Sequence, residues 1–347
     1  MNKKRNESFM IPGACSCMTL TSKTGKHYWF RTCDIETDLW KDGAHAVQQA
    51  AGEEIRYCDG KRELGKYAYI GMTYNYLDTW LLDGVNEHGL CGGLLMLYEG
   101  TSVDKEQEGQ KGYIGMELVT KMLSSCQNVE EVIALAEQIQ ILHIPYRDTS
   151  VSAVMHYFFT DSTGNEVILE AADAEHPGRL KFFSKEEILG VMTNSPPYEE
   201  QLQNLAWFLS QSPEMKQGLH GQAITKLILD GREIAADAKA KHVSLSGIFP
   251  GSYSSYDRFI RLTVLKYLNH SGNDFEDEKM LALGSGIMNA VCEPHTKGLF
   301  HYTRVEEDGK IIGQKDSFTQ YMTMYSIEER EFYIKKFDEI FWNKYTL

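Results

Sequence analysis

Three residues near the start of the chain have side chains that could together carry out nucleophilic catalysis: Cys15, Arg31 and Asp34. The thiolate is the nucleophilic form of cysteine, and a neighbouring positive charge lowers the pKa of the thiol. A cysteine beside a cation and a carboxylate is therefore a candidate nucleophile for covalent attack on a carbonyl carbon.

A predicted β-hairpin would bring these three residues together. Residues 18–22 and 27–32 are rich in β-branched, aromatic and apolar side chains, which favour strands. Between them lies a short polar turn containing Gly25, a residue type that tolerates the positive φ of tight hairpin turns. Because the second strand returns antiparallel to the first, Arg31 and Asp34 are expected beside the cysteine.

Beyond the hairpin, the chain is predicted to run from strands through paired helices and back to strands. Apolar segments between turn signals predict strands at residues 67–74, 90–98, 156–160, 166–171, 180–183, 189–192, 300–305, 321–326 and 331–337. Apolar residues at helical spacing predict helices near residues 114–122, 128–136, 198–209, 258–268 and 278–291. Asn128 can cap the second helix, with Glu131 three residues on. The polar stretch 35–63 is interpreted as irregular. This segregation predicts an α+β fold with mostly antiparallel sheets.

The overall composition excludes several classes of protein. The chain has 347 residues, 42% of them hydrophobic, and no repeat or low-complexity linker divides it, so we expect a single domain. No apolar run approaches the ~20 residues that span a bilayer. The basic residues 3–5 precede a stretch too short and too polar for a signal peptide, which favours a cytoplasmic location. The net charge of −14 argues against nucleic acid and membrane surfaces as partners.

The cysteine pattern favours free thiols. Seven cysteines without regular spacing do not predict a disulfide framework, and reduced thiols fit a cytoplasmic setting. The chain has no Cys-x-x-Cys motif, and the close pair Cys15 and Cys17 has no matching histidine motif, so no metal site is expected. Cys17 and Cys33 flank the candidate residues, and both are interpreted as small buried packing residues.

Four motifs follow one another in an informative order. They are Cys15 with Arg31 and Asp34, then Asp-Gly-Val-Asn-Glu-His-Gly-Leu at residues 83–90, Thr-Asn-Ser-Pro at 193–196 and Asp-Arg-Phe-Ile-Arg at 257–261. Each motif is weak alone, but together they resemble the choloylglycine hydrolase family, which includes bile salt hydrolases and penicillin V acylases. The resemblance extends over residues 15–337.

The resemblance implies an N-terminal nucleophile hydrolase fold of four layers, αββα, with two stacked antiparallel sheets between helices. In this family the nucleophile is the first residue of the mature chain. Residues 1–14 are therefore expected to be a propeptide, removed by self-cleavage between Ala14 and Cys15, which leaves 15–347 as one hydrolase domain. The alternative is that residues 1–14 are a tail and that the protein is never matured.

A free terminus matters because an α-amino group has a pKa of about 8 and can accept the thiol proton of its own residue. No histidine partner is then needed. His27, His88 and His143 are each interpreted as structural or solvent-facing. A papain-like peptidase is a weaker alternative, and it would require one catalytic histidine.

The resemblance also assigns roles to individual residues. Cys15 would attack the amide carbonyl and form an acyl-enzyme. Asp34 would hydrogen-bond the cysteine, Arg31 would stabilise the thiolate, and Asn194 would donate its side-chain amide to the oxyanion. Arg258 would add positive charge to the site.

One assignment has an alternative, and two parts of the sequence depart from the family pattern. Arg261 shares a helix face with Arg258 and is the rival assignment. Met96 stands where the family carries the residue that indicates the substrate, and its main-chain N–H would be the second oxyanion donor. The stretch 243–256, which would line the pocket, matches the family only around Pro250 and Gly251.

The predicted function is hydrolysis of a linear amide between an apolar acyl group and a small amine, as in conjugated bile salts or phenoxyacetyl penicillins. The partner would be a small amphipathic N-acyl amide, no cofactor is implied, and the resemblance implies a homotetramer. The alternative is a catalytically silent relative that binds an amphipathic ligand in the same pocket.

Overall fold

The computed structural model describes most of the chain from Cys15 onward. The described residues are 15–35, 38–74, 77–143, 154–211, 226–229, 232–235, 250–269, 272–295, 301–305 and 311–347. The predicted propeptide, residues 1–14, lies outside them, and so do residues 243–249 of the expected pocket loop.

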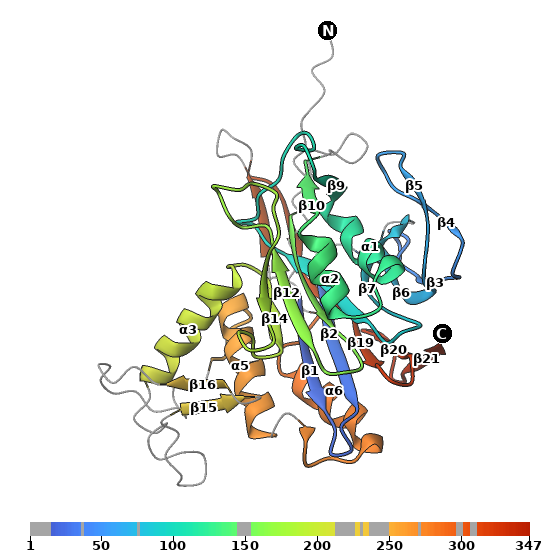
Figure 1. The fold of residues 1–347 in the computed structure, drawn as a ribbon. Helices are drawn as coiled ribbons and strands as arrows, with labels where there is room; N and C mark the ends of the chain where they lie inside the picture. Colours follow the sequence, from blue (N-terminus) through green and yellow to red (C-terminus); the bar gives the residue numbers. More distant parts are fainter. Residues whose placement is uncertain are drawn as a thin grey trace.

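Two large antiparallel sheets form the centre of the molecule (Figure 1). The strands of the first are β1 (Ser16–Thr21), β2 (His27–Ile35), β14 (Val191–Thr193), β19 (Phe318–Ser326), β20 (Glu331–Lys336) and β21 (Asn343–Thr346). Their order is β14-β1-β2-β19-β20-β21. The strands of the second are β3 (Ala46–Gln49), β6 (Tyr69–Tyr74), β7 (Leu77–Asn86), β8 (Cys91–Met96), β11 (Met155–Thr160), β12 (Glu166–Glu170) and β13 (Lys181–Ser184). Their order is β13-β12-β11-β8-β7-β6-β3.

Helices cover the outer face of each sheet. Those on the seven-stranded sheet are α1 (Leu118–Ser125) and α2 (Val129–Ala136). Those on the six-stranded sheet are α5 (Ser255–Leu268) and α6 (Met280–Asn289), with α3 (Tyr198–Gln211) packed against α5. The layers therefore run helix, sheet, sheet, helix, as predicted.

The remaining short elements lie outside the two sheets. The strand pairs are β4 (Glu54–Arg56) with β5 (Arg62–Leu64), β9 (Lys111–Ile114) with β10 (Ile139–Leu142), β15 (Lys226–Leu229) with β16 (Arg232–Ala235), and β17 (His301–Val305) with β18 (Ile311–Asp316). Two 3₁₀ turns, η1 (Gly115–Glu117) and η4 (Asp277–Lys279), precede α1 and α6.

Strand β2 shows why the layers form, because both of its faces are buried. Trp29 points toward the other sheet, and a Cβ added to Gly93 of β8 would come within 2.8 Å of its ring. Phe30 points the opposite way, and a Cβ at Gly284 of α6 would lie 2.1 Å from its ring. Glycine at these two positions allows a close approach on each side, so β2 lies at the centre of the core.

Two local predictions are confirmed. The turn between β1 and β2 contains Gly25 with φ 88°, and the hairpin pairs Thr21 with His27. The side chain of Asn128 accepts the Glu131 main-chain N–H at 2.9 Å and caps α2.

Two predictions of local structure are wrong. The stretch 35–63 is not irregular throughout, because it contains β3, which pairs with β6, and the small β4–β5 hairpin. Its polar composition reflects strands that are exposed on one side. The second concerns residues 85–89, which the sequence predicts to be a turn before the strand at 90–98. Residues 85 and 86 belong instead to β7, which pairs with both β6 and β8.

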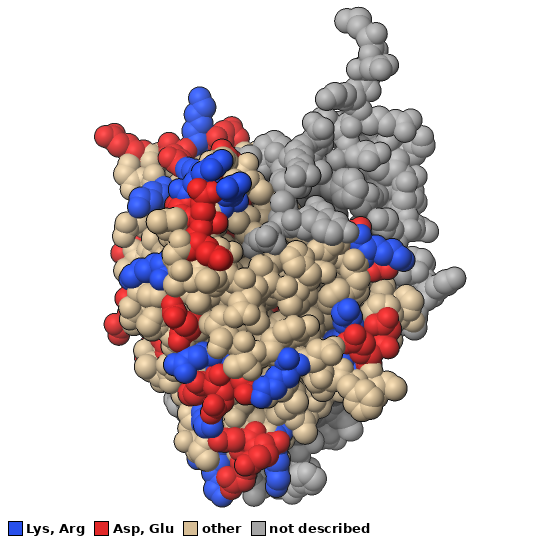
Figure 2. Space-filling view, turned by 90° about the vertical axis from the view of Figure 1, so that its right-hand side faces the viewer, with Lys and Arg blue, Asp and Glu red and all other residues tan. Residues whose placement is uncertain are grey.

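Acidic and basic side chains are interspersed on the face shown in Figure 2, around a central band of uncharged residues. Exposed ion pairs among the described residues include that of Lys61 with Glu106 at 2.6 Å. Among the helices in the described ranges, none has the length and apolar character needed to cross a membrane.

Candidate active site

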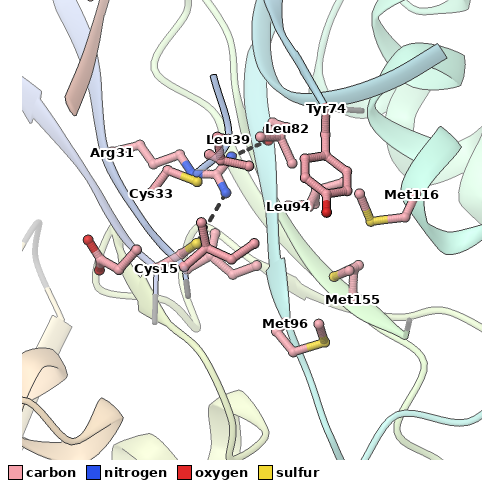
Figure 3. A pocket seen from close by; sticks show the side chains of 13 residues that line it. Cys15, Arg31, Cys33, Leu39, Tyr74, Leu82, Leu94, Met96, Met116 and Met155 are labelled. Carbon is pink, nitrogen blue, oxygen red and sulfur yellow. Dashed lines mark hydrogen bonds between the residues drawn. The ribbon is translucent and has the colours of Figure 1, made fainter. Parts of the chain in front are cut away.

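The Cys15 thiol lies between the two sheets, in a pocket of about 410 Å³ (Figure 3). The lining is apolar apart from the residues around the thiol. It consists of Cys15, Arg31, Cys33, Asp34, Ile35, Leu39, Tyr74, Leu82, Leu94, Leu95, Met96, Met116 and Met155. Cys15 is only 6% exposed. The arrangement suits a buried nucleophile at the end of an apolar binding site.

Arg31 is the cation beside the thiol. Its Nη2 donates to the Cys15 Sγ at 3.3 Å (Figure 3). Its Nη1 donates to the Leu82 carbonyl at 2.5 Å and to the Asp83 carboxylate at 3.0 Å. Two contacts from β7 therefore fix the orientation of the guanidinium toward the sulfur.

Asp83 is in turn held by two tyrosines of β19. The Tyr321 hydroxyl donates to one carboxylate oxygen at 2.9 Å, and the Tyr325 hydroxyl donates to the other. Asp83 is fully buried, so these donors and Arg31 compensate for its desolvation. The network connects the two sheets directly behind the thiol.

The surroundings of Cys15 favour its thiolate form. The Cys33 thiol is a hydrogen-bond partner of the Cys15 sulfur and makes the largest contribution to lowering the pKa of Cys15. The charge and N–H groups of Arg31 and the main-chain N–H of Asp34 act in the same direction, against the effect of burial. In contrast, burial raises the pKa of the Cys17 thiol well above its ordinary value.

Arg258 reaches the site from α5, on the other side of the six-stranded sheet. Its Nη1 donates to the Cys15 carbonyl at 2.6 Å and to the Ser16 Oγ at 2.5 Å. Its Nη2 donates to the Asn194 Oδ1 at 3.2 Å. The rival residue Arg261 instead donates to main-chain carbonyls, those of Pro250, Ser252 and Ala290.

Asn194 lies between Cys15 and β8. Its Oδ1 accepts hydrogen bonds from the Cys15 main-chain N–H and from the Arg258 guanidinium. Its Nδ2 donates to the Met96 carbonyl at 3.4 Å. The Ser195 main-chain N–H donates to the same carbonyl at 3.1 Å. The amide donor of Asn194 therefore points to the edge of β8 at Met96, a residue that lines the same pocket as Cys15.

The main-chain N–H of Met96 points to that same edge. Leu97 donates its N–H to Val154 at 3.1 Å, across the β8–β11 pairing. Main-chain groups alternate between the two edges of an antiparallel strand, so those of Met96 face away from β11. The structure thus brings two candidate oxyanion donors together, the Asn194 side chain and the Met96 N–H.

The Asp34 carboxyl lies on the opposite face of β2 from the thiol. It accepts hydrogen bonds from Thr32 Oγ1 at 3.1 Å and from Thr319 Oγ1. Burial and the nearby Glu293 carboxyl raise the pKa of Asp34 well above its usual range. The hydrogen bond of Asp34 to the Cys15 sulfur comes from its main-chain N–H.

The three histidines considered in the sequence have other surroundings. His27 contacts Glu328 at 2.7 Å, and the ring of His88 packs edge-on against Tyr67. His143 donates its main-chain N–H to the Val103 carbonyl. No histidine is among the described residues that line the pocket. In the same part of the chain, no group of His, Cys, Asp and Glu side chains is arranged to hold a metal ion.

Sequence reasoning missed Cys33 and the network behind Arg31. Cys33 lines the pocket instead of serving only as packing. The signal was available, because Arg31 and Cys33 are two residues apart in a strand and share a face. Asp83 was treated only as part of a motif, and nothing local connects it to Tyr321 and Tyr325.

Comparisons with known proteins agree on the family and the fold. Residues 15–347 match the family described as linear amide C–N hydrolases, choloylglycine hydrolase family. A bile salt hydrolase/transferase from Clostridium perfringens is 24% identical over 331 residues, which cover 93% of this chain and 89% of that protein. One from Lactiplantibacillus plantarum is 24% identical over 202 residues, covering 58% of this chain and 56% of that protein.

Solved structures show the same architecture. A mutant of the conjugated bile acid hydrolase from Clostridium perfringens superposes with a TM-score of 0.72 at 20% identity, covering 96% of this chain and 92% of the other. Penicillin V acylase from Agrobacterium tumefaciens gives a TM-score of 0.68 at 18% identity, covering 96% and 86%. These likenesses confirm the predicted four-layer α+β fold.

Proposed function

The chain belongs to the choloylglycine hydrolase family of linear amide C–N hydrolases, and we propose that it cleaves the amide bond of an N-acyl substrate with Cys15 as the nucleophile. The observation that carries the proposal is the Arg31 guanidinium 3.3 Å from the Cys15 sulfur, at an apolar pocket. A cation at that distance favours the thiolate, which is the attacking species.

The reaction has two stages. The Cys15 sulfur attacks the carbonyl carbon and forms a tetrahedral oxyanion, which collapses as the C–N bond breaks and the amine leaves with a proton. Water then attacks the acyl-thioester, and the carboxylic acid and the free thiol are released. The Asn194 amide and the Met96 N–H would stabilise the oxyanion, since the Asn194 Nδ2 lies 3.4 Å from the Met96 carbonyl and the Met96 N–H faces the same edge of β8.

The proton acceptor in this proposal is the α-amino group that Cys15 acquires when residues 1–14 are removed. Two observations support it: the matched family region begins at residue 15, and no histidine is among the described pocket residues. The main-chain nitrogen of Cys15 already donates to Asn194 Oδ1, and the same contact would orient the amine.

Arg258 acts as a positioning group in this scheme. Its guanidinium donates hydrogen bonds to the Cys15 carbonyl and to the Asn194 Oδ1. The second contact fixes the orientation of the Asn194 amide, so that its Nδ2 group is the one available to the substrate. Asp34 supports the thiolate through its main-chain N–H, while its carboxyl maintains the packing of β2 against β19.

The acyl side of the substrate is apolar. Leucine and methionine side chains dominate the pocket beyond Arg31, and Figure 3 shows Met96, Met116 and Met155 on the side of the pocket opposite Cys15. An acyl group without internal charge fits such a lining, because a buried unpaired charge is costly. The relatives' names point to bile salts, and the penicillin V acylase fold neighbour points to phenoxyacetyl amides.

Two measurements on the purified protein test the proposal. Intact mass and N-terminal sequencing should find a chain that starts at Cys15. That protein should release the amine from at least one of glycine-conjugated bile salts, taurine-conjugated bile salts, penicillin V or N-acyl homoserine lactones.

Each opposite result has a defined meaning. A blocked Cys15 together with full activity would overturn the role of the amine. A matured chain that binds bile salts but turns over none of the panel would instead support the catalytically silent binder.

A further inference from the structure

A second thiol lies opposite the proposed nucleophile. Cys15 and Cys33 both line the pocket, and they are 6% and 3% exposed. The β1–β2 register pairs Ser16 with Thr32 and Cys17 with Arg31, so its next step pairs Cys15 with Cys33. In the proposed mechanism the Cys33 thiol supports the Cys15 thiolate through a hydrogen bond but takes no covalent part.

The type of pairing can be read from neighbouring hydrogen bonds. Ser22 donates its N–H to Lys26 across the hairpin, and Thr19 donates its N–H to Gly190 of the strand on the other side. Even-numbered residues of β1 therefore bond to β2, and odd-numbered ones bond toward β14. Cys15 and Cys33 then form a non-hydrogen-bonded pair.

A pair of this type has the geometry that a disulfide needs. Directly opposite residues in non-hydrogen-bonded positions have Cα atoms about 4.5 Å apart and side chains on the same face. Disulfides require a Cα separation of roughly 4.4–6.8 Å. The two sulfurs could join with little movement of the backbone.

The two thiols are also chemically unequal. The surroundings of Cys15 lower its pKa and favour its thiolate, while the hydrogen bond to Cys15 and burial raise the pKa of Cys33 well above its usual value. Oxidants attack the thiolate first, so Cys15 is the reactive member and Cys33 is its protonated neighbour.

We propose that Cys33 is a resolving cysteine, and that a peroxide converts Cys15 and Cys33 into a reversible disulfide that closes the active site. The proposal concerns regulation of the site and rests on the proposed function only for its effect on activity. The disulfide itself depends on the geometry alone.

The chemistry balances in two steps. The Cys15 thiolate attacks one oxygen of hydrogen peroxide, and the O–O bond breaks. The departing hydroxide takes up the proton that the thiol had lost and leaves as water, and Cys15 becomes a sulfenic acid. The sulfur is oxidised by two electrons and the peroxide is reduced. The Cys33 sulfur then attacks the sulfenic sulfur, the S–O bond breaks, and the Cys33 proton departs in a second water. Arg31 lies beside both sulfurs, and its charge favours deprotonation of Cys33 once the charge on Cys15 is gone.

Cys17 is the nearest competitor and serves as the matched control. It is buried on the same face but lies opposite Arg31 in the register. Burial raises the pKa of the Cys17 thiol, which makes it a poor nucleophile. Its register partner is Arg31, so it does not lie directly opposite Cys15.

Peptide mass spectrometry tests the proposal independently of activity. The purified protein is treated with hydrogen peroxide, alkylated and digested with trypsin. The peptide that ends at Lys23 should become cross-linked to residues 32–41, which contain Cys33. The same cross-link should form in Cys17→Ala, which removes the other thiol of the first peptide, and should be absent in Cys33→Ala.

The activity arm compares recovery after oxidation, with each variant normalised to its own untreated rate. Peroxide-treated wild type should regain most of its activity with dithiothreitol. Cys33→Ala should lose activity irreversibly as Cys15 proceeds to sulfinic and sulfonic acid. Equal overoxidation of Cys15 in both proteins, with Cys33 still free in wild type, would overturn the proposal. If the protein has no hydrolase activity, the proposed function is wrong. The presence or absence of the Cys15–Cys33 cross-link would still show whether the disulfide forms.

Discussion

The two faces of the β1–β2 hairpin provide different chemistry to the same residue. On the inner face, Cys15 presents its sulfur to Arg31, Cys33 and an apolar pocket. On the outer face, the helix layer supplies Arg258, which binds the Cys15 carbonyl. The sulfur is thus controlled from inside the sandwich, and the main chain that carries it is fixed from outside.

The acidic groups show the same division. Asp83 lies on the inner side and orients Arg31. Asp34 and Glu293 lie on the outer side, where burial raises the pKa of both carboxyls. Arg31 and Asp34 are therefore close in the sequence motif without sharing a role. Inner groups should govern the reactivity of the thiol, and outer groups should govern position and stability.

The largest effect is expected from the nucleophile itself. Cys15→Ala should abolish amide hydrolysis and also the removal of residues 1–14, because the same sulfur would perform both. Cys17→Ala, on the same inner face, should leave both largely intact. Amine release and intact mass measure the two outcomes, and the reverse pattern would show that the nucleophile has been assigned to the wrong cysteine.

Asn194→Ala should lower kcat by a factor of about a hundred, the cost of losing one oxyanion donor. KM should change less, since the donor acts mainly on the transition state. Steady-state kinetics measure both constants, and circular dichroism checks that the fold is retained. A change confined to KM would place Asn194 in substrate binding instead.

Thiol reactivity distinguishes the two faces directly. Arg31→Gln and Cys33→Ala should each shift the alkylation profile of Cys15 by iodoacetamide to higher pH, because each removes a group that lowers its pKa. The shift for Arg31→Gln should be roughly 1–3 pH units. Alkylation at each pH is followed by mass spectrometry of the Cys15 peptide.

The outer face supplies the control for that experiment. Asp34→Asn should leave the profile in place or move it slightly to lower pH, since it removes a negative neighbour while keeping the main-chain N–H. An upward shift as large as that of Arg31→Gln would contradict the division between the faces.

The smallest effect concerns stability on the outer face. A carboxyl whose folded pKa is raised contributes stability that is present below its ordinary pKa and is lost as pH rises through the folded pKa. The Tm of wild type should therefore fall relative to Asp34→Asn as pH rises through that window, by about 1–2 °C per kcal/mol for a chain of this length. Calorimetry at a series of pH values measures the difference. A difference that is constant with pH would mean that Asp34 titrates normally.

Local signals were enough to predict several elements. Gly25 between two β-rich runs gave the hairpin, and Asn128 with Glu131 gave the start of α2. The sequence also contained the information that the Arg31 and Asp34 side chains lie on opposite faces of β2. The two residues are three positions apart, and side chains alternate between the faces of a strand. Treating both as neighbours of the thiol overlooked that rule.

The sequence by itself determined the family, the hairpin and the chemically competent residues, because motif order and turn chemistry are properties of neighbouring positions. Tertiary structure decided which of Arg258 and Arg261 reaches Cys15, and it joined Arg31 to Asp83, Tyr321 and Tyr325. Arg258 and Arg261 share one face of a helix, and only the packing of α5 against the six-stranded sheet distinguishes them. Asp83 and Tyr321 are far apart in the sequence, and they meet only because the inner faces of the two sheets are buried against each other.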